Sequence, residues 1–533
     1  MEGVQLLLPV AQGANPCIAL VTAGMAVLAT ACWLVIRLVF VKGNTDRRPC
    51  EADGMRMVPG SRGLPIIGET LEFLALSPSL QIPAFFQRRL DRYGPLFKTN
   101  MIMEDLIVSL DPEVTNFVFQ QEERLFQMWY PDSFIRIIGT DSLIRTHGLL
   151  HRHIKNLALR LFGPENLRRE IIHDVQKTVE ASLSSWLNQP SIELKEAVSS
   201  MIFKVTAKKL ISYDSSTSDG KMWKQYDAFT QGLFAFPLCI PGTAFYKCMQ
   251  GRKNVIKMLK EILDERKNTE EHHESVDFFD VIEEVKAENP DQMTENAALD
   301  LLFLLLFASF ETTSSGITAM LIFLTDNPEA LQELIEEHNN IRKRKADKNS
   351  EITWEEYKSM KFTSHVIHEA LRLASIAPVM FREAIEDVHI KGFAIPKESK
   401  IMICPYTVHL NPVVYKDPNT FNPWRWKISK NRIKECRLYS INSLHKVLIC
   451  CMHVAIYVRN IPEPASGASK DFMAFGGGLR LCVGAHFANL QMAVFLHCLV
   501  TKYSWKAIKG GRMALSPGLR FPEGFHIQLF PKA

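Results

Sequence analysis

The chain has 533 residues, enough for more than one average domain, although helical enzymes built around a large cofactor often exceed the usual domain size. Hydrophobic residues make up 47% and charged residues 23%, which is typical of a globular protein with a large core. The formal net charge is only +4, so nucleic-acid binding is not predicted. Eleven cysteines without regular spacing argue against a disulfide framework and favour a reducing compartment.

Near the N-terminus, residues 17–36 are apolar or small and carry no charge, and the segment has the length that a membrane-spanning helix needs. Basic residues follow it between positions 37 and 48, whereas only acidic Glu2 precedes it, so the positive-inside rule places the rest of the chain in the cytosol. A cleaved signal peptide would carry its basic residues before a shorter apolar core. We therefore predict a retained signal-anchor, residues 1–42, in the endoplasmic reticulum membrane.

A charged segment rich in proline and glycine follows at residues 43–70 and predicts a hinge before one large domain, residues 71–533. Strand-type residues at Tyr93–Thr99 and Leu106–Leu110 predict a small sheet in an otherwise helical chain. Amphipathic helices follow, with an apolar break at Phe234–Thr243. An exposed apolar loop of this kind indicates membrane contact or a substrate entrance.

A long helix is predicted from Thr294, a suitable N-cap, to Asp326, where the following Asn-Pro forbids continuation. Its run Leu301–Phe307 is apolar on every side, which indicates burial in protein, and it is too short to cross a membrane before Glu311 interrupts it. Glu311 and Thr312 in such a helix cost free energy unless they are hydrogen-bonded or used in chemistry. The alternative for Thr312 is a hydrogen bond to its own helix.

A glycine-rich loop near the C-terminus leads to Cys482, just before a helix predicted from Ala485 to Val500. The helix N-terminus and nearby Arg480 are expected to favour a thiolate, which suits a metal ligand or a nucleophile. A zinc site would need four ligands, and none is suitably spaced here. A haem iron needs only one strong protein ligand, because the porphyrin supplies four nitrogens. The remaining alternative is an inert buried cysteine.

The pattern Phe475-x-x-Gly478-x-Arg480-x-Cys482-x-Gly484 resembles the proximal loop of the cytochromes P450, the haem-thiolate monooxygenases. The resemblance implies a mainly α fold with a small β region, carried on a single N-terminal transmembrane helix. It also implies haem b with Cys482 as axial ligand, Arg480 paired with a haem propionate, and Phe475 packed beside the sulfur. Gly478 and Gly484 belong to the same cofactor-binding loop. Electrons are expected from NADPH through NADPH-cytochrome P450 reductase.

Two helical segments extend this resemblance. His151 and Lys155 occupy places where the family usually has tryptophan and arginine contacting the haem propionates, although a basic helix face is often simply solvated. The segment around Ser309 resembles the oxygen-activating segment, with serine where glycine is commoner. By that resemblance Thr312 donates a hydrogen bond to dioxygen and Glu311 supplies protons through water.

A third motif, Glu369-Ala-Leu-Arg372, would be unremarkable by itself, because such acid–base pairs are abundant on helix surfaces. The family joins this glutamate to Arg372 and a downstream arginine, here Arg425, in a buried network behind the haem. The order of these motifs along the chain supports the resemblance.

Several segments are similar in sequence to those of plant members of the family that oxidise sterols, brassinosteroids and triterpenoids. The sequence therefore predicts monooxygenation of a rigid apolar molecule, with hydroxylation or successive oxidation as the reaction. Alternatives are a sterol side-chain-cleaving oxidase, a haem-thiolate isomerase or lyase, and a catalytically impaired splice-type variant. The predicted substrate-wall residues are Phe236, Leu238, Phe307, Ser309, Ile376, Ala377, Val379 and Met380.

One segment does not fit the resemblance. Between Trp426 and Phe472 the family usually has a short connection, but this chain carries an apparent insertion at about residues 430–462. Its Cys450, Cys451 and His453 lack the spacing of a zinc site. We interpret the segment as a non-family insertion, such as a translated intron, beside the face where the electron donor is expected to dock.

Overall fold

The computed structural model describes Thr30 and residues 55–532, apart from 66, 102–103, 141, 214–219, 234, 269–276, 289–292, 346, 348–349 and 428–470. The predicted transmembrane segment, except for Thr30, and the predicted insertion at 430–462 lie outside these residues. Both stay predictions.

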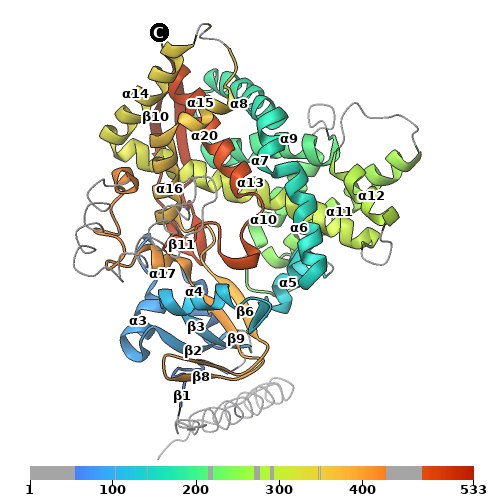
Figure 1. Cartoon of the computed structure of the whole chain (residues 1–533), viewed down its shortest axis with the longest axis vertical. Coiled ribbons are helices and arrows are strands. Elements are labelled where there is room, and N and C mark those ends of the chain that lie inside the picture. Colours follow the sequence, from blue (N-terminus) through green and yellow to red (C-terminus); the bar gives the residue numbers. More distant parts are fainter. Residues whose placement is uncertain are drawn as a thin grey trace, which may run out of the picture.

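Helices make up most of the described chain (Figure 1). The α-helices are α2 (Thr70–Leu74), α3 (Ala84–Tyr93), α4 (Pro112–Gln120), α5 (Asp132–Ile138), α6 (Gly148–Phe162), α7 (Pro164–Asn166), α8 (Ile172–Leu187), α9 (Leu194–Ile211), α10 (Lys221–Gly232), α11 (Ala244–Asn268), α12 (Phe278–Glu288), α13 (Glu295–Asp326), α14 (Pro328–Arg344), α15 (Trp354–Ser359), α16 (Lys361–Ala374), α17 (Pro405–His409) and α20 (Ala485–Lys502). Short 3-10 and π turns are η1 (Leu143–Arg145), η2 (Leu167–Ile171), η3 (Pro423–Trp426) and η4 (Gly478–Arg480).

The strands gather mainly at one end of the molecule, below the helices in Figure 1. The main sheet has the order β2-β3-β9-β6-β4, in which β3 and β9 are parallel and the other neighbours are antiparallel. Smaller sheets have the orders β1-β8-β7, β10-β13-β5 and β11-β12. The strands are β1 (Arg56–Met57), β2 (Leu96–Met101), β3 (Glu104–Ser109), β4 (Phe126–Met128), β5 (Ile192–Glu193), β6 (Met380–Ala384), β7 (Val388–Ile390), β8 (Phe393–Ile395), β9 (Lys400–Ile403), β10 (Tyr503–Gly510), β11 (Ala514–Ser516), β12 (Gly518–Arg520) and β13 (Phe525–Pro531).

This architecture confirms the predicted fold class, a mainly helical chain with a small β region. Helix α13 begins where the sequence predicts: the Thr294 hydroxyl accepts a hydrogen bond from the backbone N–H of Ala297 at 3.2 Å, and the helix ends at Asp326. The predicted hairpin is also present, since β2 and β3 pair antiparallel. Helix α20 starts at Ala485 as predicted and runs two residues beyond Val500, to Lys502.

Helix α13 crosses the middle of the helical part and packs against α9, α16 and α20 (Figure 1). Among the described residues it is the one helix long and apolar enough to cross a membrane, but 67% of its most apolar window is buried inside the protein. The apolar run therefore serves the protein core, as its sequence predicts.

Candidate active site

The glycine-rich loop before α20 folds into a compact turn. The backbone N–H of Cys482 donates to the carbonyl oxygen of Phe475 at 3.0 Å, which closes the loop. Gly478 has φ +65°, and a Cβ there would come within 2.4 Å of the Glu122 carboxylate, so the position requires glycine. At Gly484 a Cβ would meet only the Cys482 sulfur, at 3.9 Å, so the chain leaves open space beside the sulfur.

The Cys482 side chain is solvent-accessible, yet burial raises the pKa of its thiol. The two observations agree if the sulfur faces an internal space, which a water molecule reaches although protein surrounds it. The backbone N–H groups of Gly484 and Ala485 and the charge of Lys155 lower this pKa, but burial outweighs them. The N–H groups of the helix N-terminus therefore act on Cys482 in the predicted direction, but burial raises the pKa of the free thiol overall; a coordinated metal ion would deprotonate it.

Helix α13 also faces an internal space. Ala308 and Thr312, one turn apart, have exposed side chains, although their neighbours Phe307 and Thr313 are buried. The Thr312 hydroxyl donates to the Ala308 carbonyl oxygen at 2.7 Å, so the local hydrogen bond considered as an alternative is present. Its oxygen can still accept a hydrogen bond, which leaves Thr312 able to interact with a molecule in that space.

The carboxylate of Glu311 is paired rather than free. Its Oε1 lies 2.7 Å from Lys195 Nζ, at the start of α9, and both side chains are partly buried. Arg520, on β12, is near enough for Glu311 to raise the pKa of its guanidinium, against the larger lowering effect of burial. Two cations therefore offset the cost of placing this acid in an apolar helix.

The segment after α16 contacts both α13 and the cysteine loop. Four predicted substrate-wall residues lie there: Ile376, Ala377, Val379 and Met380. A Cβ on Gly316 of α13 would lie 3.4 Å from Ile376, and a Cβ on Gly476 of the cysteine loop would lie 3.4 Å from Met380. The structure thus brings this segment together with both elements of the predicted site.

The remaining substrate-wall candidates are spread more widely. Phe236 and Leu238 lie on the connection between α10 and α11 and are 39% and 47% exposed. Phe307 is buried, with its ring centroid 5.0 Å from that of Phe229. The Ser309 hydroxyl donates to the Leu306 carbonyl oxygen at 2.7 Å. The assignment of all four to a substrate wall stays a prediction.

Basic side chains gather at one edge of the cysteine loop. Lys155 donates to the Leu479 carbonyl oxygen at 2.9 Å, and Arg480 contacts the Thr146 carbonyl oxygen. Burial lowers the pKa of Arg480 to about 10, although the Glu122 carboxylate acts in the opposite direction.

The residues around that edge fit a buried anionic group. Within the described chain, His151 is buried with an Nδ1 atom that has no hydrogen-bond partner, and burial lowers the pKa of this imidazole to about 4. Arg480 supplies a positive charge at the same edge, close to the Glu122 carboxylate. Together with one sulfur beside open space, this donor set suits a haem, which offers one open axial position and two carboxylates.

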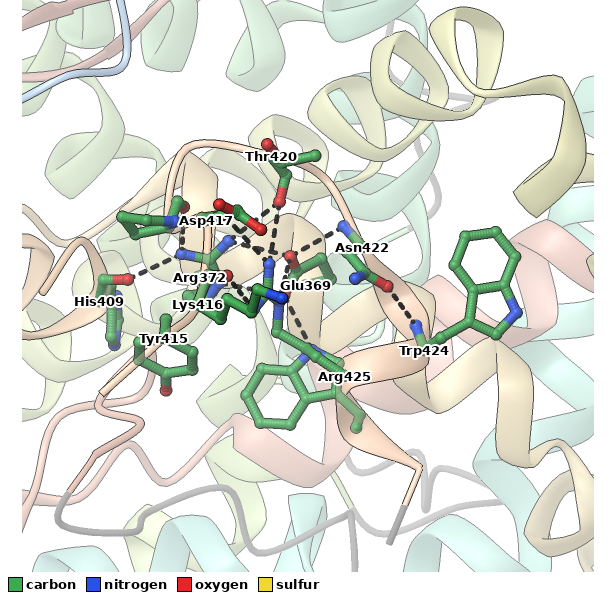
Figure 2. A network of polar contacts seen from close by, with 12 residues as sticks. Glu369, Arg372, His409, Tyr415, Lys416, Asp417, Thr420, Asn422, Trp424 and Arg425 are labelled. Atoms are coloured by element: carbon green, nitrogen blue, oxygen red, sulfur yellow. Dashed lines mark hydrogen bonds and ion pairs between the residues drawn. The ribbon is translucent and has the colours of Figure 1, made fainter. Parts of the chain in front are cut away.

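Glu369, Arg372 and Arg425 form a network of polar contacts in which Glu369 and Arg372 are fully buried (Figure 2). Arg372 donates to both oxygens of Glu369, at 3.0 and 2.9 Å, and Arg425 Nε donates to Glu369 Oε1 at 2.9 Å. The indole N–H of Trp426 also donates to Glu369, at 2.9 Å. Arg372 then donates to the His409 carbonyl oxygen at 2.7 Å, which ties α16 to α17.

Some residues at the site have no counterpart in the sequence-based prediction. Arg382, on β6, is 1% exposed and pairs with Glu122 at 2.6 Å, while Lys195 holds Glu311. Arg382 and Arg480 lie near Tyr130, where each lowers the hydroxyl pKa although burial raises it overall. The only sequence signal was the charged pair Arg382 and Glu383 within the strand Met380–Ala384. Nothing near Glu122 or Lys195 in the sequence pointed to their partners.

Comparisons with known proteins identify the family. The sequence profile described as "Cytochrome P450" matches residues 58–522. Cytochrome P450 87A3 of Oryza sativa subsp. japonica is 48% identical over 90% of this chain and 86% of its own length. Cucurbitadienol 11-hydroxylase of Siraitia grosvenorii is 37% identical over 89% and 93% of the two chains, and cholesterol 22-hydroxylase CYP90B27 of Paris polyphylla is 32% identical over 95% and 98%.

The solved structure titled "Retinoic acid bound cyanobacterial CYP120A1" superposes with a TM-score of 0.72 over 90% of this chain and all of that chain. Its sequence is 24% identical, so it supports the fold alone. The chain belongs to the cytochrome P450 family and is a P450 monooxygenase.

Proposed function

We propose that this monooxygenase hydroxylates, or successively oxidises, a rigid apolar molecule of the sterol or triterpenoid class. The observation that carries the substrate class is its similarity to hydroxylases whose names specify such molecules: cucurbitadienol, β-amyrin and cholesterol, at 37%, 36% and 32% identity. Each similarity extends over most of both chains. Electrons come from NADPH through NADPH-cytochrome P450 reductase, and the enzyme works at the endoplasmic reticulum membrane.

The geometry supports a division of roles within the chain. Cys482 holds haem b, which when bound supplies the iron chemistry that inserts oxygen into a C–H bond. Arg480, His151 and Lys155 anchor the haem carboxylates, with Phe475, Gly478 and Gly484 shaping the loop. The Glu369 network ties α17 and η3 to α16.

On the other side, the exposed hydroxyl of Thr312 orients dioxygen by donating a hydrogen bond, for which it turns away from the Ala308 carbonyl oxygen, and Glu311 supplies protons through water. Glu311 lies 2.7 Å from Lys195 Nζ in this structure, and this contact holds its side chain beside the helix. Apolar side chains of Ile376, Val379 and Met380 exclude water from the substrate.

The test is turnover by membranes that contain the full chain and the reductase, with cucurbitadienol, β-amyrin and cholesterol supplied separately. We expect an NADPH-dependent product 16 mass units heavier than one of these substrates, and no product from Cys482→Ser. If no polycyclic substrate shifts the haem spectrum or yields product, while smaller apolar molecules do, the proposed substrate class is wrong.

The turnover assay and a carbon monoxide spectrum together distinguish the alternative functions. A product lacking side-chain carbons would identify successive oxidation with cleavage. Turnover without NADPH would identify an isomerase or lyase. Absence of the red-shifted carbon monoxide band in the reduced protein would identify a chain that does not assemble its haem site.

A further inference from the structure

The turn between α4 and β4 contains two consecutive acids with different partners. Glu123 has φ +64°, which costs a residue with a side chain about 1–2 kcal/mol, so the surrounding contacts must stabilise this conformation. Its N–H donates to the Phe126 carbonyl oxygen at 2.7 Å. Its carboxylate accepts from the N–H of Gly148 at 3.0 Å and from Arg152 at 2.9 Å, which fastens the turn to the start of α6.

Glu122 precedes this left-handed residue, and its side chain contacts β6 and the cysteine loop instead of α6. Glu122 is buried, and its Oε1 accepts from Arg382 Nε at 2.7 Å and lies 2.6 Å from Arg382 Nη2. Its Oε2 accepts from the backbone N–H of Arg480 at 3.3 Å. One carboxylate therefore joins strand β6 to the cysteine loop.

The cysteine loop is shaped to fit this carboxylate. A Cβ at Gly478 would come within 2.4 Å of Glu122 Oε2 and 2.5 Å of the Phe119 carbonyl oxygen, and a Cβ at Gly477 would come within 2.8 Å of the Phe119 ring. The glycines that precede Cys482 thus allow the loop to approach the end of α4 closely. Glu122 is the charged group at that contact.

We infer that Glu122 is a positioning residue of the haem-binding edge. Its carboxylate holds Arg382 and the Gly478–Arg480 turn where they bind a haem carboxylate, so Glu122 controls how tightly the chain retains haem. This role rests on the chain's being a haem protein and requires no particular substrate.

The neighbouring acid, Glu123, provides a matched control for Glu122. Comparing the two separates the effect of losing a negative charge from the effect of losing the contacts of Glu122 with Arg382 and the cysteine loop. Glu122 and Glu123 both raise the pKa of Arg480, so removing either carboxylate changes the local electrostatic potential. Only Glu122 contacts Arg382 and the cysteine loop. A negative charge near the haem stabilises the ferric form, so both Glu→Gln variants should raise the reduction potential of the bound iron.

The experiment measures haem release from the full-length loaded protein to excess apomyoglobin, together with the reduction potential by dye-coupled titration. We expect Glu122→Gln to release haem about tenfold faster than the wild type. This is the size of effect expected from the loss of one charged hydrogen bond that positions the haem-binding edge. Glu123→Gln keeps a side-chain oxygen that can accept from the Gly148 N–H, so the turn should stay fastened to α6, and haem should be released at close to the wild-type rate while the potential shifts upward. Glu122→Asp, which keeps the charge on a shorter side chain, should lie between Glu122→Gln and the wild type.

Equal release rates for Glu122→Gln and Glu123→Gln would overturn the inference, because charge alone would then explain both. If Glu122→Gln is not recovered folded, Glu122→Asp is compared with Glu123→Asp instead. Glu122→Asp is then expected to release haem faster than Glu123→Asp, and equal release rates would again overturn the positioning role of Glu122. Neither measurement uses a substrate, so failure here is distinct from failure of the sterol or triterpenoid proposal.

Discussion

At the scale of single residues, Thr312 offers a clear test because α13 also contains a closely matched threonine. Thr312→Val keeps the shape of the side chain and removes the hydroxyl that faces the internal space. We expect the product formed per NADPH consumed to fall about five- to tenfold, since one hydrogen bond to the reacting oxygen is lost. Haem content should not change. The measurement is the ratio of product to NADPH, with hydrogen peroxide determined alongside.

The control is Thr318→Val. The Thr318 hydroxyl also donates to a carbonyl oxygen four residues earlier, that of Ser314, at 2.8 Å, but Thr318 is fully buried. This variant should retain the wild-type ratio of product to NADPH. If both variants formed equally less product per NADPH consumed, a general change in helix α13 would explain the loss. Thr312 would then have no specific role in the proposed mechanism.

The sequence located residues whose signal is local and missed those whose partners are distant in the chain. Spacing within a few residues identified Cys482, Arg480 and Thr312 as candidates. Glu122 and Arg382 are 260 residues apart, and Lys195 and Glu311 are 116 apart, so no local pattern connects them. The pKa of Cys482 shows the same difference: the helix N-terminus, which lowers this pKa, can be recognised in the sequence, whereas the burial that raises it cannot.

At the scale of elements, the Glu369 network joins α16 to α17 and η3 (Figure 2). Glu369 and Arg372 have no exposed side-chain surface, so Glu369→Gln leaves buried cations without their carboxylate. We expect the free energy of unfolding to fall by about 3–5 kcal/mol, with loss of haem-loaded protein. Urea unfolding of the purified variant measures the change.

A surface pair provides the comparison for this variant. Glu261 lies 3.6 Å from Lys257 one turn away on α11, and both side chains are mostly exposed. Glu261→Gln should change the unfolding free energy by less than about 0.5 kcal/mol. A similarly small effect of Glu369→Gln would mean that the network contributes little to stability.

Three helices meet at a buried pair of histidines. His338 Nδ1 of α14 lies 2.9 Å from His497 Nδ1 of α20, and His338 Nε2 lies 3.0 Å from the Thr363 hydroxyl of α16. That hydroxyl donates to Glu337 at 2.6 Å, so its oxygen accepts from His338 Nε2–H. His338 Nδ1 must then accept from His497 Nδ1–H, which fixes both rings as neutral tautomers.

This arrangement makes stability depend on pH in the acidic range. Burial lowers the pKa of His497 to about 4 and that of His338 well below its usual 6.5. Below pH 6.5 the unfolded chain binds protons that the folded chain does not, so the free energy of unfolding falls as the pH is lowered. We expect a slope of about 1.4 kcal/mol per pH unit for each histidine between pH 6.5 and its folded-state pKa.

Urea unfolding at a series of pH values measures this slope. His497→Gln should reduce it, whereas His389→Gln, at an exposed position on β7, should leave it unchanged. An unchanged slope in His497→Gln would show that other groups cause the acid sensitivity.

At the scale of the whole molecule, sequence predicts elements better than their assembly. The ends of α13 follow from a capping threonine and a proline, both of which act locally. The pairing of β3 with β9 brings Leu106 beside Lys400, and nothing in either strand specifies that partner. Apolar residues of both strands pack in two clusters with residues of α3 and α4, so the pairing depends on contacts between segments that are distant in the chain.

The fold also provides a test of the predicted insertion, because the two chain segments that flank it are in contact. The rings of Trp426 and Phe472 lie 5.0 Å apart, and the Tyr415 hydroxyl donates to the Asp471 carbonyl oxygen at 2.6 Å. Deleting residues 430–460 would leave about a dozen residues between the flanks, which can span roughly 40 Å. The remaining connection is therefore long enough.

We expect this deletion to raise the yield of haem-loaded protein, because it removes an apolar, β-prone stretch that favours aggregation and leaves the described site intact. The measurement is the carbon monoxide difference spectrum per unit of protein, compared with that of the full chain. A lower haem content after deletion would show that residues 430–460 contribute to the folded enzyme. The segment would then have to be counted as part of the haem domain.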